Sequence, residues 1–248
     1  MQDLAGLSYF GQLLTVFLRL MTEHHKTFMR KLLFSLSIAL LIQLSAVAQK
    51  RISDLTLVYE ANVTTGSKTP QLGDAFDGAT TTVYIKGNQS RSEMVSALAS
   101  FTTIHDSRTG TSVLLQEVNG QKLLIRMSAD NWKEKNKRYE GITFTNTGQK
   151  KQLAGYDCLQ ATAKMKDGAT FTVYYTPDLM PENMEFDYQF INLNGVPLEY
   201  ELTQNNLTIR YTVSKINLNP VAASKFDIPT SGYRELSYDE SRKMGIVK

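Results

Sequence analysis

The clearest pattern in the chain is an alternation of apolar and polar positions with a period of two, between residues 184 and 213. In the first run the apolar positions are Met184, Phe186, Tyr188 and Phe190. Two further runs, over residues 198–202 and 207–213, repeat the alternation with aliphatic residues and tyrosine. Successive side chains of a β-strand point to opposite faces of the sheet, so this period predicts three neighbouring, half-buried strands.

Short loops fix how these strands pair. A two-residue turn at Asn205 and Asn206 matches both faces of the last two strands at once. The resulting cross-strand pairs are Leu202 with Ile209, Tyr200 with Tyr211, and Glu201 with Arg210. A three-residue loop ending at Gly195 pairs Phe190 with Leu198, because a two-residue turn there would mix the two faces.

The rest of the chain has the closely spaced turn residues of an antiparallel meander. Glycine, asparagine and their neighbours mark predicted reversals at residues 87–88, 109–110, 119–120, 147–148, 167–168 and 194–195. Across a loop at residues 166–168 the aligned pairs are Ala161 with Val173 and Ala163 with Phe171. No interval has the length and the 3.6-residue period of repeated crossover helices, which argues against a parallel sheet.

Helix is predicted in only two places. The stronger pattern begins at Ser128, a good N-cap residue, has Asp130 in its first turn and continues over residues 132–138. A second short turn is expected over residues 221–225. The predicted fold class is therefore all-β with minor helix.

The N-terminal part has the pattern of a secretory signal peptide. Residues 29–48 combine a positively charged start, an apolar run over residues 32–44 and small residues before the end, so cleavage is expected between Ala48 and Gln49. The run is shorter than the ~20 apolar residues of a spanning helix, which favours cleavage over an uncleaved anchor. Residues 1–28 form an N-terminal extension, which a misplaced start codon explains. The sequence thus predicts an exported protein of the periplasm or the extracellular space.

The exported part is expected to be one antiparallel β domain over residues 49–233, followed by a polar tail over residues 234–248 that frays at its end. Removing the segment before Gln49 takes away four of 27 basic and two of 24 acidic residues, which leaves a net charge of +1. Such a charge gives no drive toward nucleic acid. Cys158 is the one cysteine, which excludes an intramolecular disulfide, and we interpret it as a buried filler.

Candidate catalytic and metal-binding residues are few. His105 is the one histidine after the predicted cleavage point, and no serine lies in a Gly-x-Ser-x-Gly motif. One histidine and one distant cysteine do not make a zinc site. The carboxylates interpreted as a solvent-facing ladder, rather than as a glycosidase pair, are Glu185, Asp187, Glu199 and Glu201. We predict no enzymatic activity, no metal and no cofactor.

Three short motifs carry a resemblance to a known family: LAGYDC at residues 153–158, VYYTPDL at residues 173–179, and FDIPTSGY at residues 226–233. They resemble secreted domains of unknown function common in Bacteroidota, over roughly residues 55–233. That family is similar to the LolA-like lipoprotein carriers. The resemblance implies a single curved antiparallel sheet, an open half-barrel whose concave side is closed by helical segments and holds an acyl chain.

The resemblance also implies that inward apolar side chains bind the ligand. The residues assigned to this hydrophobic face are Phe186, Tyr188, Phe190, Leu198, Tyr200 and Tyr211. A second candidate is a membrane-surface patch, motivated by a tryptophan among lysines and consisting of Trp132, Lys133, Lys135 and Lys137. The alternative for that patch is a solvated helix face.

The leading hypothesis is an exported, non-enzymatic envelope protein that binds a lipid or another hydrophobic ligand on a concave β-sheet. The alternative is an envelope module for protein–protein interaction or structure, in which the same aromatic residues fill the core. A second alternative, an uncharacterised hydrolase, would need a pocket that joins His105 and Asp178 from distant strands. An open apolar groove would favour the first hypothesis and a filled face the second. No spanning helix is expected in the mature form.

Overall fold

The computed structural model describes residues 50–66, 72–204 and 207–247. The predicted N-terminal extension, the signal peptide and the cleavage point between Ala48 and Gln49 lie outside the described residues, as does the turn at residues 205–206. Within the described part of the chain, none of the helices has the length and apolar character needed to cross a membrane.

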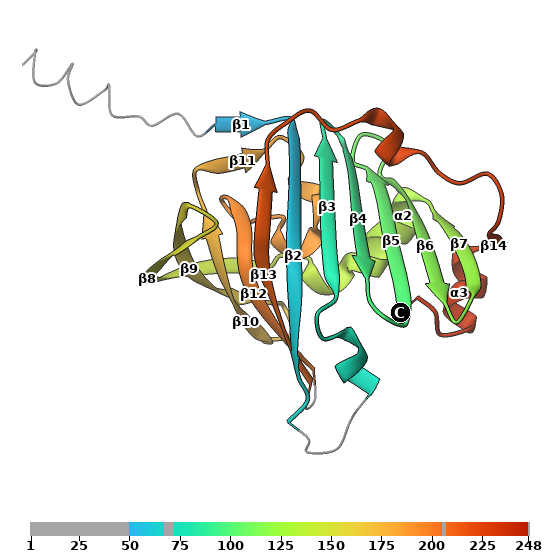
Figure 1. The fold of residues 1–248 in the computed structure, drawn as a ribbon, viewed down its shortest axis with the longest axis horizontal. Coiled ribbons are helices and arrows are strands. Elements are labelled where there is room, and N and C mark those ends of the chain that lie inside the picture. The colour runs from blue at the N-terminus through green and yellow to red at the C-terminus, as the bar shows by residue number, and fades with distance from the viewer. Residues whose placement is uncertain (1–49, 67–71, 205–206, 248) are drawn as a thin grey trace, which may run out of the picture. The chain divides into compact units, whose positions relative to one another are not determined.

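One large sheet dominates the described residues, and it is antiparallel except at one edge (Figure 1). Its strands, in spatial order, are β14 (Arg234–Leu236), β7 (Gln121–Met127), β6 (Thr111–Val118), β5 (Ala99–Asp106), β4 (Gln89–Val95), β3 (Thr80–Lys86), β2 (Asp54–Thr64), β13 (Leu207–Asn217), β12 (Val196–Gln204), β10 (Thr170–Thr176), β9 (Tyr156–Lys164) and β8 (Thr143–Leu153). A small parallel pair joins β1 (Lys50–Ile52) to β11 (Leu179–Pro181). The mostly β, open antiparallel fold class is confirmed.

The hairpin registers predicted from the alternation are confirmed. In β12 and β13, Leu202 pairs with Ile209 and Glu201 with Arg210. In β9 and β10, Ala161 pairs with Val173 across a turn that contains Gly168. These pairs are local in sequence, so the side-chain pattern and the loop length were enough to fix them.

One predicted reversal, at Thr147 and Gly148, is wrong because β8 runs straight through it. The ladder between β8 and β9 shifts register between Asn146 and Lys150, and the Asn146 side chain accepts a hydrogen bond from the Gly148 N–H at 2.7 Å. The turn-forming residues therefore make a bulge in an edge strand, which is a common place for one.

The predicted strand over residues 184–190 is also wrong. The segment forms two 3₁₀ turns, η3 (Met184–Phe186) and η4 (Tyr188–Phe190). The side chains of Asn183 and Asp187 accept hydrogen bonds from the backbone N–H groups two residues ahead, at 3.0 and 3.2 Å, which closes each turn. The second neighbour of β12 is β10 instead, with Val173 opposite Tyr200.

Gly195, which enters β12 from this segment, is required for a steric reason. A Cβ at this position would collide with the carbonyl group of Thr176. The backbone of the incoming chain thus lies directly against β10, an approach that only glycine permits.

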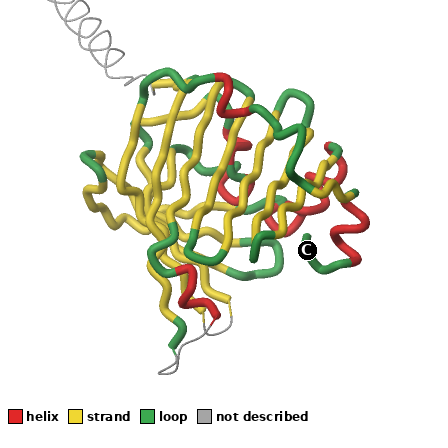
Figure 2. Tube along the Cα trace, turned by 45° about the vertical axis from the view of Figure 1, so that its right-hand side comes forward, coloured by secondary structure: helices red, strands yellow, loops and turns green. Residues whose placement is uncertain are grey.

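The sheet bends around helix α2 (Ala129–Asn136), as the two views show (Figures 1 and 2). As predicted, Ser128 caps this helix: its hydroxyl accepts from the Asn131 N–H at 3.2 Å, and the Asn131 side chain bonds back to the Ser128 N–H. Trp132 of α2 packs on Ile125 and Met127 of β7, and the chain continues into a 3₁₀ turn, η2 (Lys137–Tyr139). The helix therefore covers the concave face of β5–β7.

The outer face of the same strands is covered by the chain that follows β13. Its 3₁₀ turn η5 (Ala223–Phe226) lies close to the predicted turn, and Val221 and Phe226 pack against Ile104 and Leu124 of the sheet. A further 3₁₀ turn, η1 (Leu72–Phe76), precedes β3.

The prediction that the C-terminal tail frays is wrong. Strand β14 pairs in parallel with β7, and helix α3 (Tyr238–Lys243) follows it. Ser237 and Glu240 form a capping box at the start of α3. Leu236, Tyr238 and Val247 are buried in the cluster around Trp132. Few apolar residues are present in this segment, but three of them are placed to reach the core.

Candidate functional site

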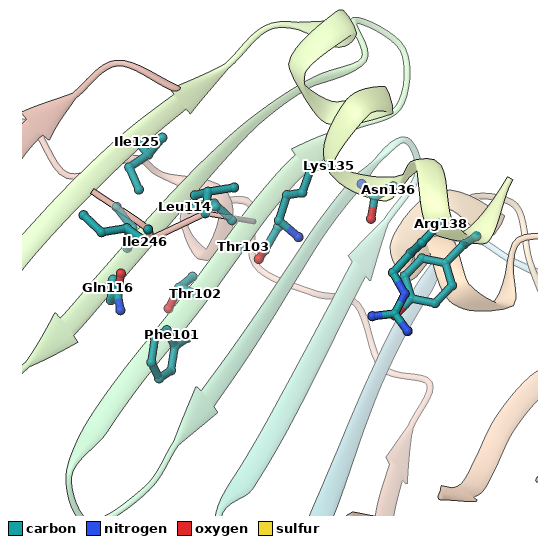
Figure 3. Close-up of a pocket in the computed structure, with 14 residues that line it drawn as sticks. Phe101, Thr102, Thr103, Leu114, Gln116, Ile125, Lys135, Asn136, Arg138 and Ile246 are labelled. Atoms are coloured by element: carbon teal, nitrogen blue, oxygen red, sulfur yellow. The ribbon is translucent and has the colours of Figure 1, made fainter. Parts of the chain in front are cut away.

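A cavity of about 460 Å³ lies on the concave face of β5, β6 and β7. The helical segment of α2 and η2 borders it on one side, and the C-terminal residues 245–247 border it on another (Figure 3). Its apolar lining includes Phe101, Leu114, Ile125 and Ile246, and its polar lining includes Thr103, Gln116, Lys135 and Arg138. This volume is within the usual range for a small-molecule site.

The floor of the cavity follows from strand register. Thr103 of β5 pairs with Leu114 of β6, and Leu114 pairs with Ile125 of β7. One row of side chains therefore crosses three strands on the same face. Phe101 and Gln116 form the next row, two residues along each strand. Because this part of the sheet alternates apolar residues with threonine and glutamine, it leaves room where aromatic residues would fill it.

Two cations lie on the helical side of the cavity. Lys135 is half-buried, and its ammonium group lies 5.6 Å from the centre of the Trp132 ring. Arg138 lies with its guanidinium carbon 5.1 Å from the centre of the Tyr139 ring. Burial lowers the pKa of Lys135, and the negative charge of Asp187 opposes part of that shift. Both side chains are thus positioned beside an apolar floor.

Asp187 is half-buried, so the prediction that it belongs to a solvent-facing ladder is wrong. Burial raises the pKa of this carboxyl to about 6, against hydrogen bonds from Gln189 and the charge of Lys135, which lower it. The hydroxyl of Tyr59 donates to the Pro197 carbonyl at 2.7 Å, and burial raises the pKa of Tyr59 and of Tyr200. The negative charge of Asp187 also raises the pKa of Tyr59, Tyr200 and Tyr211, so these tyrosines lie near the carboxylate.

His105 connects α2 and η3 to the sheet. Its Nδ1 lies 2.8 Å from the hydroxyl of Ser112 on the neighbouring strand, and its Nε2 lies 3.3 Å from a carboxylate oxygen of Glu185. Its ring stacks on Trp132 at a centroid distance of 4.6 Å. The structure thus joins His105 to Ser112 and Glu185, rather than to Asp178 as the hydrolase alternative required. The Ser112 side chain is buried, at 3% exposure.

Four of the six residues predicted to form the ligand-binding face are buried in the core, and Tyr188 and Tyr211 are half-buried. Phe190 and Leu198 have no exposed surface, and Tyr200 is 8% exposed. The aromatic cluster in this half of the sheet includes Phe186, Phe190, Tyr200 and Tyr211. Tyr188 packs edge-on against Trp132, at a centroid distance of 6.4 Å. The lining of the cavity includes none of these side chains.

The predicted membrane-surface patch is divided by the fold. Trp132 is buried against His105, so it is not presented to a membrane surface. Lys133 and Lys137 are exposed, whereas Lys135 lines the cavity. The sequence pattern at the cavity is weaker than the aromatic alternation or the lysine cluster. It consists of threonine and glutamine between apolar residues on the inner face of β5 and β6, and of two apolar residues near the C-terminus.

Comparisons with known proteins assign no family. No family model and no curated protein matches the chain. Among solved structures it is similar to PNGF-II (10% identity, TM-score 0.47, 77% of this chain and 33% of that chain), MucB (11%, 0.34, 73% and 59%) and LprF from Mycobacterium bovis (8%, 0.30, 67% and 87%). The chain thus spans about a third of the length of PNGF-II. With such TM-scores these similarities carry no argument about function.

The fold and the site together define a class: a mostly β protein with an open antiparallel sheet, one half of which is filled by aromatic residues while the other half holds a cavity under a short helix. The cavity combines an apolar floor with two cations on its helical side, and this combination suits a ligand that has both an apolar and a polar part.

Proposed function

We propose that this protein is an exported, non-enzymatic binding protein that holds a lipid or another hydrophobic ligand in the cavity over β5–β7. The observation that carries the proposal is the cavity itself, about 460 Å³ in volume and lined by the apolar residues Phe101, Leu114, Ile125 and Ile246. The signal-peptide pattern of residues 29–48 supports the exported part of the proposal.

The energetics of an apolar floor favour such a ligand. A ligand that buries about 200 Å² of apolar surface gains roughly 5 kcal/mol from its removal from water. Ordering the ligand offsets part of this gain. The aromatic half of the sheet stabilises the fold. The cavity can therefore stay open when no ligand is bound.

The experiment is native mass spectrometry of the protein exported from the full-length gene in a Gram-negative host, with lipid extraction of the same sample. We expect an adduct at a near-stoichiometric level that yields an amphipathic species on extraction. The variant Thr103→Trp places a large ring on the cavity floor and should remove the adduct. Thr172→Trp is the matched control, because Thr172 is exposed on β10 and does not line the cavity.

A second candidate function, an envelope module for protein–protein interaction, is favoured by a separate observation. Val95 and Leu98, on either side of the turn between β4 and β5, are 55% and 50% exposed. Contiguous exposed apolar surface is a feature of protein–protein contact sites. An unliganded mass for the wild-type protein, together with a folded chain, would shift the proposal to this module.

A further inference from the structure

We propose that the ligand of the cavity is a single-chain amphiphile with an anionic headgroup, a carboxylate or a phosphate, whose headgroup lies at Lys135 and Arg138. This inference rests on the proposed function and goes beyond it, because it names the chemical class of the ligand and its orientation.

Neither cation of the cavity has an anionic partner at contact distance in the part of the chain that the structure describes. Among the described residues, no carboxylate lies within 4.0 Å of either charged group. Lys135 is half-buried and Arg138 is exposed; the other half-buried cations among the described residues are paired, as Lys151 is with Glu199 at 2.6 Å. Lys135 and Arg138 instead lie against aromatic rings, so a ligand anion could accept hydrogen bonds from their N–H donors.

Asp187 is the carboxylate that acts on Lys135 through the electrostatic field. Its own oxygens are engaged by Gln189, which donates its backbone N–H at 3.2 Å and its side-chain amide at 3.4 Å. Asp187 does not line the cavity, whereas Lys135 does. A ligand anion would therefore meet Lys135 from the cavity side while Asp187 stays behind it.

Charge and apolar surface are separated across the cavity. Lys135 and Arg138 belong to the helical segment, and the apolar floor lies on the strands opposite (Figure 3). An acyl chain on the floor and an anion at the helical side satisfy both surfaces at once. Because Lys135 is partly desolvated, its attraction to an anion is screened less than it would be on the open surface.

The test measures binding of dodecanoate and of dodecyltrimethylammonium, below their micellar concentrations, by isothermal titration calorimetry on the protein purified after expression of the full chain. The two probes share their chain length and differ in the charge of the headgroup. We expect dodecanoate to bind at least about tenfold more tightly, since one charge-assisted hydrogen bond corresponds to about that factor. Equal affinities would overturn the inference and leave the proposed function standing.

Variants assign the headgroup position. Lys135→Gln and Arg138→Gln should each weaken dodecanoate binding about tenfold or more and leave binding of dodecyltrimethylammonium unchanged or stronger. Lys133→Gln is the matched control, because Lys133 lies on the same helix and does not line the cavity. Lys135→Arg keeps the charge and should keep the preference for dodecanoate over dodecyltrimethylammonium. This variant therefore separates the loss of the charge from misfolding caused by a substitution at this position. Unchanged dodecanoate affinity in both Gln variants would overturn the inference.

Two further probes separate this inference from its rivals. Dodecyl phosphate should bind like dodecanoate, whereas inorganic phosphate alone should bind at least about tenfold more weakly, because it lacks the apolar chain. Inorganic phosphate binding as tightly as dodecyl phosphate would show a site for a free anion and refute the amphiphile. If none of the chain-bearing probes binds, the proposed function itself fails, which is a different outcome from equal binding of both head charges.

Discussion

The substitution Phe190→Ala tests whether the aromatic half of the sheet is a core or a binding surface. Phe190 has no exposed surface. Its ring lies 4.9 Å from the ring of Tyr200, 6.1 Å from that of Phe171 and 6.5 Å from that of Phe144, measured between centroids. Truncating a buried phenylalanine removes its transfer free energy and leaves a cavity, at a typical cost of about 3–5 kcal/mol.

Several aromatic neighbours place Phe190 in the upper part of that range, because each edge-to-face pair adds about 0.5–1.5 kcal/mol beyond the buried area. We therefore expect Phe190→Ala to lower the free energy of unfolding by about 4 kcal/mol. The assay is urea unfolding followed by the fluorescence of Trp132, the single tryptophan of the sequence. Domains of this size have stabilities of roughly 5–15 kcal/mol, so the variant should still fold.

The matched substitution is Phe101→Ala, at a half-buried ring on the cavity floor. We expect it to cost about 1 kcal/mol in stability, as a partly exposed side chain does, and to weaken ligand binding. Phe190→Ala should leave the affinity of the folded protein for dodecanoate unchanged. The reasoning is refuted if Phe190→Ala costs less than about 1 kcal/mol and abolishes binding, since the aromatic face would then be the ligand surface.

Three further predictions concern other parts of the structure. The pKa of Asp187 is raised to about 6, above its ordinary value, so between about pH 4 and pH 6 the folded state holds a proton that the unfolded state releases. The free energy of unfolding should therefore fall as pH rises from about 4 to about 6. The variant Asp187→Asn should reduce this pH dependence, measured as urea midpoints. Burial raises the pKa of Cys158 to about 11, so a thiol reagent at neutral pH should label it slowly until urea unfolds the chain, and rapid native labelling would contradict its burial. Leu236→Ala should cost about 2–3 kcal/mol, whereas Met244→Ala, at a side chain that is 56% exposed, should change the urea midpoint little; equal effects would mean that β14 and α3 do not belong to the core.

The parts of the fold that were predicted correctly depend on residues close in sequence. The pairs Leu202 with Ile209 and Ala161 with Val173 follow from a turn and a two-residue alternation, and both are present. The cap at Ser128 is likewise a local hydrogen bond. In each case the sequence window that carries the signal also contains the interaction that stabilises the structure.

The segment over residues 184–190 shows where this reasoning fails. Its alternation of aromatic and acidic residues is typical of a strand, yet Asn183 and Asp187 cap two successive 3₁₀ turns. Phe186 and Phe190 are buried, as the strand prediction also required. Periodicity therefore identified Phe186 and Phe190 as buried, but it missed the buried Gln189 and the backbone conformation, because turn-forming side chains compete with the ladder for the backbone donors.

The cavity could not be predicted from such windows, because it is formed by segments far apart along the chain. Thr103 and Leu114 become neighbours through a hairpin, but Lys135 reaches them from α2 and Ile246 from the C-terminal end. The two halves of the sheet then differ for a simple reason of volume. Aromatic rings such as Phe190 and Tyr200 fill the space inside one half, and threonine and glutamine leave it open in the other. Side chains such as Phe101 and Leu114, which are half-buried on the cavity floor, contribute less to folding than the fully buried Phe190 of the other half. The partly open floor over β5–β7, with Thr103 and Gln116 between apolar residues and two cations on its helical side, is the feature that the proposed binding function would explain.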